Sequence, residues 1–215
     1  MKADPGRRDP SGREHFRKWA PRYERSLLQA ILFEPTHRAA LDAASSVLPA
    51  AGTILDVGCG TGKLLERAAG RWPGALLTGI DLVPEMIREA RRKHPDDPRF
   101  RFEVADSQAL PLEAASFDLA FSTHSFHHWP DQAGGIREVA RVLRRGGLFV
   151  LADAACPFVP SALASRFHGE RARERLFGEA GLSVVLQRRP LRLGRQVLIT
   201  VGRSGPAAAR GAGPG

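Results

Sequence analysis

The sequence predicts an α/β fold, with one domain built on a doubly wound, seven-stranded and mostly parallel sheet. Beyond Ser46, short apolar runs alternate with stretches whose apolar residues recur at the three- and four-residue spacing of a helix. Most of the runs are largely apolar, with at most two polar residues each, which is typical of parallel strands covered on both faces. The last two runs are joined only by residues 187–196, too few for a crossover helix, so we expect an antiparallel last strand.

Each element of this fold is predicted by a local pattern. The strands are expected at 53–57, 76–80, 100–104, 117–121, 148–152, 182–186 and 197–201. The helices are expected over 63–69, from 84 to about 90, from 131 to 146 and over 171–180. Pro84 suits the first position of its helix and Asp131 can cap the next one, which Gly146 and Gly147 would end.

The chain divides into four segments by composition. They are a disordered basic arm (1–13), an N-terminal helical lid (14–46), the α/β domain (47–202) and a disordered tail (203–215). The lid has a helical pattern that Pro21 and Pro35 are expected to break into pieces.

Charge and cysteine content exclude several classes of protein. The net charge of +9 comes from the two ends, since residues 26–187 carry 18 basic against 19 acidic side chains. Such ends are usually solvated tails, which argues against nucleic acid as a partner. Two cysteines without CxxC spacing predict reduced thiols and no metal site. With no apolar run long enough for a membrane span or a secretory signal, we expect a cytoplasmic protein.

Three glycines stand at every second position in the stretch ILDVGCGTG, where the first strand would turn into a helix. Gly58, Gly60 and Gly62 can adopt the positive φ angles of a tight turn. They also let a ligand approach the backbone, which side chains at these positions would block. Ligands of doubly wound sheets bind outside the carboxyl ends of the strands. The pattern therefore predicts a cofactor site rather than a tight turn alone.

The spacing of the motif argues against a dinucleotide and against a nucleoside triphosphate. A G-x-G-x-x-G pattern would need glycine where the chain has Lys63, and a P-loop would need Ser or Thr where it has Leu64. Asp81 ends the second strand and has two acceptor oxygens for a pair of ribose hydroxyls. A nucleoside without a pyrophosphate is therefore the best candidate.

These motifs resemble those of class I S-adenosylmethionine-dependent methyltransferases. ILDVGCGTG is similar to their first motif, and Asp81, VADSQALPLEAASFDLAFSTHSFHHWPD and IREVARVLRRGGLFVLAD are similar to the later ones in order and spacing. The branch that the chain most resembles is type 11, the ubiquinone/menaquinone C-methyltransferase-like group, over about residues 14 to 202. The resemblance implies a Rossmann-like fold, S-adenosylmethionine as cofactor and S-adenosylhomocysteine as product.

The resemblance also implies cofactor contacts for individual residues. The methionine end would lie against Asp56, Gly58, Cys59, Gly60 and Gly62, beside Ser122, Thr123 and His124, with Tyr23 reaching it from the lid. The ribose would be held by Asp81, and the adenine by Leu82, Asp106 and Ser107.

A sulfonium is an activated methyl donor, so transfer mainly requires an acceptor held in line in a dry site. A general base helps when the acceptor is a phenol, a hydroxyl or an acidic carbon, and histidine titrates in the useful range. His127 and His128 in THSFHHW are therefore the candidate catalytic residues, while packing of the lid is the alternative role for them. Adjacent histidines without a nearby cysteine or acid cluster do not favour a metal.

The predicted acceptor is a small, apolar or aromatic molecule, because the connection ACPFVPSALASR after the fifth strand is short for this branch. The alternatives are a nucleic-acid or protein methyltransferase and a non-catalytic S-adenosylmethionine-binding scaffold. Amino-methylating nucleic-acid enzymes carry an Asn/Asp-Pro-Pro-aromatic motif where this chain reads STHSFHHW. The motifs do not distinguish carbon, oxygen and nitrogen acceptors, and no pattern indicates an oligomeric state.

Overall fold

The computed structural model describes residues 33–154, 169–190 and 197–205. In chain order the elements are α2 (Glu34–Val47), β1 (Thr53–Val57), α3 (Lys63–Arg71), β2 (Leu76–Asp81), α4 (Pro84–Lys93), β3 (Phe100–Val104), β4 (Phe117–Thr123), the 3-10 helix η2 (Phe126–His128), α5 (Gln132–Val142), β5 (Leu143–Ala154), α7 (Glu170–Glu179), β6 (Leu182–Arg188) and β7 (Val197–Ser204).

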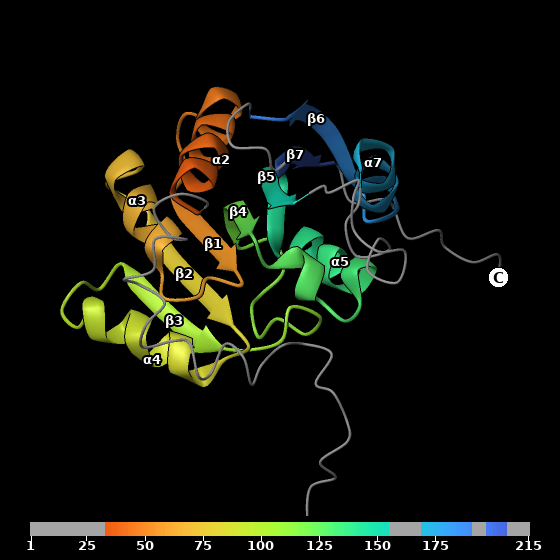
Figure 1. The fold of residues 1–215 in the computed structure, drawn as a ribbon. Coiled ribbons are helices and arrows are strands. Elements are labelled where there is room, and N and C mark those ends of the chain that lie inside the picture. Colours follow the sequence, from red (N-terminus) through yellow and green to blue (C-terminus); the bar gives the residue numbers. More distant parts are fainter. Residues whose placement is uncertain (1–32, 155–168, 191–196, 206–215) are drawn as a thin grey trace, which may run out of the picture.

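The strands form one seven-stranded sheet in the order β3-β2-β1-β4-β5-β7-β6 (Figure 1). β7 pairs antiparallel with both β5 and β6, and the other recorded pairs are parallel. The order reverses direction at β1, the switch point of a doubly wound sheet, where ligands bind beyond the strand ends. The predicted fold, with its antiparallel last strand, is confirmed.

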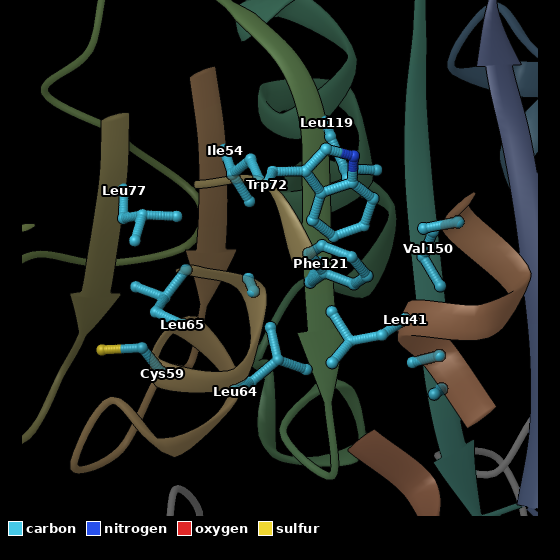
Figure 2. Packing of buried hydrophobic residues seen from close by; sticks show 14 of the residues in the cluster. Leu41, Ile54, Cys59, Leu64, Leu65, Trp72, Leu77, Leu119, Phe121 and Val150 are labelled. Carbon is cyan, nitrogen blue, oxygen red and sulfur yellow. The ribbon is translucent and has the colours of Figure 1, made fainter. Parts of the chain in front are cut away.

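Helices cover both faces of the sheet, as the apolar strands require. One buried cluster joins α2, α3 and α4 to the sheet, and a second joins α5 and α7 to the opposite face. Figure 2 shows Leu41 of α2 and Leu64 of α3 directed at Phe121 of β4 in the first cluster. The C-terminal part of the expected lid, residues 34–46, thus packs on the sheet as α2.

Two helix starts follow the predicted signals. Pro84 occupies the first turn of α4, and the Asp131 carboxylate accepts a hydrogen bond from Gly134 N at 2.8 Å, which caps α5. Pro35 likewise lies in the first turn of α2. The Pro21 break lies outside the described residues.

The prediction that Gly146 and Gly147 end the helix capped by Asp131 is wrong. α5 ends at Val142, and both glycines lie within β5, with Gly146 at φ +80°. Leu143 already pairs with Phe117, and Val142 O accepts from Ser116 N at 2.8 Å. The helix ends earlier because Ser116, just before β4, donates to its last carbonyl and Leu143 already pairs with β4, contacts that no local sequence signal predicts.

Across the described residues, no helix is long and apolar enough to cross a membrane.

Candidate functional site

A cleft lies at the carboxyl ends of β1, β2 and β4. Most predicted site residues line it, namely Asp56, Gly58, Cys59, Gly60, Asp81, Leu82, Asp106, Ser107, Thr123, His124 and His128. Gly62, Ser122 and His127 are not on its wall. Tyr23 lies outside the described residues. The cleft therefore brings together motifs that are up to about 70 residues apart in the chain, from Asp56 to His128.

The three glycines of the first loop all have positive φ, but only one of them leaves open space. A Cβ on Gly58 would overlap Ser125, and one on Gly62 would lie 2.9 Å from the Phe102 ring. A Cβ on Gly60 would meet nothing within 4 Å. Gly58 and Gly62 are thus needed for packing, while Gly60 exposes its backbone to the cleft.

Asp81 fixes this loop with its carboxylate. Oδ2 accepts a hydrogen bond from Gly60 N at 2.8 Å and Oδ1 accepts one from Val83 N at 2.8 Å. Burial raises the pKa of Asp81, and the backbone donors at Val83 and Gly60 oppose that rise. Each carboxylate oxygen can accept more than one hydrogen bond, so both remain able to receive donors from a ligand in the cleft.

Asp56 is a buried carboxyl group that lacks a partner on one oxygen. Its residue is 1% exposed, and Oδ1 accepts no hydrogen bond within the described part of the chain. Burial, followed by the charge of Asp81, raises the pKa of Asp56 to about 8. A cationic donor from a ligand would supply what this group lacks, because buried charges are normally paired.

The segment after β3 adds a third acidic residue to the cleft. Asp106 Oδ1 accepts hydrogen bonds from Gln108 N at 3.0 Å and Gln108 Nε2 at 3.2 Å. This local turn holds the carboxylate at the wall beside Ser107. Asp81 and Asp106 thus both stand at ends of neighbouring strands.

The histidines of THSFHHW occupy different environments. His124 has φ +50° and its ring meets Phe33 edge-on at 4.6 Å between centroids. His128 lines the cleft, and its ring centroid is 3.9 Å from that of His127.

His127 makes a bidentate contact with Asp153, at the end of β5. Its Nδ1 lies 2.8 and 3.0 Å from the two carboxylate oxygens, and its backbone N donates to Oδ2 at 3.0 Å. Burial would raise the pKa of Asp153, but the His127 hydrogen bond and the charges of His127, His124 and Arg173 outweigh it and bring the pKa to about 2. An ionised carboxylate only accepts, so Nδ1 is the donor in this contact.

The sequence interpretation missed Asp153 and His37. His37 lies on α2, is 7% exposed and lines the cleft. Burial, then the charges of His124, Arg67 and Lys63, lowers the pKa of His37 to about 3. The only sequence signal for a role of His37 at this site was its four-residue spacing from Phe33, a residue that lines the same cleft.

Residues 55–151 match a family model described as a methyltransferase domain. The chain is 38% identical over 150 residues to the 27-O-demethylrifamycin SV methyltransferase of Amycolatopsis mediterranei (strain S699), covering 67% of this chain and 54% of that protein. It is 35% identical over 117 residues to the ubiquinone/menaquinone biosynthesis C-methyltransferase of Geobacter sp. (strain M21), covering 53% and 50%. The chain thus spans about half the length of these curated relatives.

Among solved structures, the chain is similar to the Burkholderia thailandensis 1,6-didemethyltoxoflavin-N1-methyltransferase, solved with 1,6-didemethyltoxoflavin and S-adenosylhomocysteine bound. The TM-score is 0.72 at 20% identity, over 95% of this chain and 94% of that one. At this identity the likeness shows a shared fold.

Proposed function

We propose that this chain, which belongs to the type 11 branch of class I S-adenosylmethionine-dependent methyltransferases, transfers a methyl group to a small, apolar or aromatic acceptor. The observation that carries the proposal is the cleft in which the glycine loop, Asp56 and Asp81 meet. When bound there, S-adenosylmethionine supplies an activated methyl group on its sulfonium.

The residues of the cleft fit this cofactor. Asp56 offers a buried Oδ1, which has no hydrogen-bond partner among the described residues, to the ammonium group of the methionine end. The open backbone at Gly60 leaves room for that end of the molecule, and Thr123 and His124 border it. Asp81 would hold the ribose hydroxyls, while Leu82, Asp106 and Ser107 would hold the adenine.

Three of the expected contacts have less support. Gly62 and Ser122 lie behind the wall of the cleft, with Gly62 against Phe102 and Ser122 fully buried in β4. Their expected role is therefore to shape the wall rather than to touch the cofactor. A contact from Tyr23 remains a prediction, because that residue lies outside the described part of the chain.

In the proposed mechanism His127 is the general base. The Asp153 carboxylate orients the imidazole through the Nδ1 proton, so that Nε2 receives the proton of a hydroxyl, a phenol or an acidic carbon. His127 is 22% exposed, which leaves the ring open to a molecule bound beside the cleft. His128, on the cleft wall and in ring contact with His127, is the second candidate for this role.

The experiment is a transfer assay with methyl-labelled S-adenosylmethionine and a panel of phenols, hydroquinones and polyketide-like phenols. We expect label in at least one aromatic acceptor. Donor binding without transfer to any acceptor would instead support the non-catalytic scaffold. No donor binding by folded protein would refute the proposal.

A further inference from the structure

A buried arginine of α7 lies behind the pair formed by His127 and Asp153. Arg173 is 1% exposed. Its Nη1 donates to Leu198 O at 2.6 Å, and its Nη2 donates to Asp153 O at 3.0 Å. Leu198 on β7 is the register partner of Asp153 on β5. One guanidinium therefore ties the two strands together at the residue that carries the carboxylate.

Burying a guanidinium is costly, and an apolar side chain could fill the same space at lower cost. What the arginine adds is a positive charge close to a buried carboxylate. Burial lowers the pKa of Arg173 to about 10, so the side chain stays charged at neutral pH. Its charge is one of those that keep Asp153 ionised.

We propose that Arg173 is a positioning residue that holds the Asp153 carboxylate in place and charged, so that α7 contributes to the general base. The catalytic consequence rests on the function proposed above for His127. The effect of Arg173 on the titration of His127 does not rest on that function, because it can be measured without an acceptor.

The expected effect follows from the charged groups that surround this pair. Asp153 faces His127 from β5, His128 contacts the His127 ring from within η2, and His124 after β4 acts on the Asp153 charge. Arg173 itself faces Arg189, which pairs with Glu170 at 2.9 Å. Removing the Arg173 charge leaves the carboxylate less compensated, which favours the imidazolium form of His127.

The experiment is a pH titration of the histidine ring nitrogens by 15N NMR, with His127→Gln used to assign the His127 signals. In Arg173→Met we expect the His127 titration midpoint to rise by about half a pH unit or more. Arg173→Lys, which keeps the charge, should restore most of the wild-type value. Arg175→Met removes an exposed charge from the same helix and should leave the midpoint unchanged.

If Arg173→Met does not fold, Arg173→Gln keeps hydrogen-bond donors without the charge and gives the same comparison with Arg173→Lys. A His127 midpoint that is equal in the folded Gln and Lys variants would overturn the inference and leave Arg173 a structural residue. If the wild-type protein transfers no methyl group, that result counts against the proposed function but not against the effect of Arg173 on His127. If both methyl transfer and the effect of Arg173 on His127 are observed, the acid limb of the pH profile of turnover should move to higher pH in Arg173→Gln.

Discussion

Asp56 and Asp153 are the same residue type, at the ends of strands of one sheet and each 1% exposed, yet their pKa values are shifted in opposite directions. Burial and the nearby Asp81 raise the pKa of Asp56 to about 8. Against the same penalty of burial, the His127 hydrogen bond and the charges of His127, His124 and Arg173 bring the pKa of Asp153 to about 2. Within the described residues, Asp153 has counter-charges nearby, whereas no cationic group is recorded beside Asp56.

This difference separates the edge of the sheet into two halves. Around β1 and β2 the carboxyl groups face an open cleft, where a cationic ligand would complete the charge balance. At the end of β5 the carboxylate is already paired, and its effect passes to the ring of His127. We infer that the first half binds the methyl donor and the second handles the proton of the acceptor.

The largest expected effect comes from breaking the proton-handling half. Asp153→Asn and His127→Ala should each lower turnover by about 10²- to 10⁴-fold, because the oriented base is lost. Donor affinity should stay within about twofold of wild type, since the other half is intact. Steady-state kinetics with the best acceptor and calorimetry with the donor measure the two quantities.

His94→Gln is the control, because His94 stacks on Phe100 away from the cleft. Unchanged turnover in both Asp153→Asn and His127→Ala would mean that positioning alone suffices for catalysis. His128→Ala would then decide whether the other histidine is the base.

A smaller effect is expected from Asp81→Ala in the donor-binding half. Lost hydrogen bonds to a charged group correspond to about 1.5–3 kcal/mol of donor binding, or roughly 10- to 150-fold in Kd. Asp97→Ala is the matched control, since Asp97 pairs with Arg99 away from the cleft. Equal donor affinity in the wild type and Asp81→Ala would remove the ribose assignment.

The smallest effects separate two glycines of one loop. Gly62→Ala places a methyl group against Phe102 at positive φ and should cost about 2–4 kcal/mol of folding free energy. Gly60→Ala meets no neighbour and should cost about 1–2 kcal/mol, but should weaken donor binding about tenfold. Thermal unfolding measures the loss of stability and calorimetry measures the loss of donor affinity. If Gly60→Ala lost more stability and Gly62→Ala lost more donor affinity, Gly60 would not face the ligand.

Much of the fold and of the donor-binding half was predictable, because their signals are local. The apolar runs predicted the strands, and loop glycines followed by Asp81 and Asp106 predicted residues that the structure brings together in one cleft at the strand ends. The early end of α5 was not predictable, since it depends on pairing between Phe117 and Leu143 across the sheet.

The proton-handling half was only partly predictable. His127 stood out as a histidine, but Asp153 is 26 residues away and Arg173 lies on a helix where arginine normally faces solvent. Their grouping depends on β5, β7 and α7 meeting, which no spacing in the sequence encodes. The local pattern also gave Gly58, Gly60 and Gly62 the same role, although their neighbours differ.

The most direct test of the contrast between the two aspartates is calorimetry of S-adenosylmethionine and S-adenosylhomocysteine binding near pH 7, in buffers of different ionisation enthalpy. Free Asp56 has a raised pKa of about 8 and is mostly protonated at pH 7, and a bound cation lowers that pKa, so binding should release about one proton. Donor affinity should accordingly rise with pH up to about 8. The release should vanish in Asp56→Asn and persist in Asp153→Asn. A binding enthalpy that is independent of the buffer in the wild type would contradict the account.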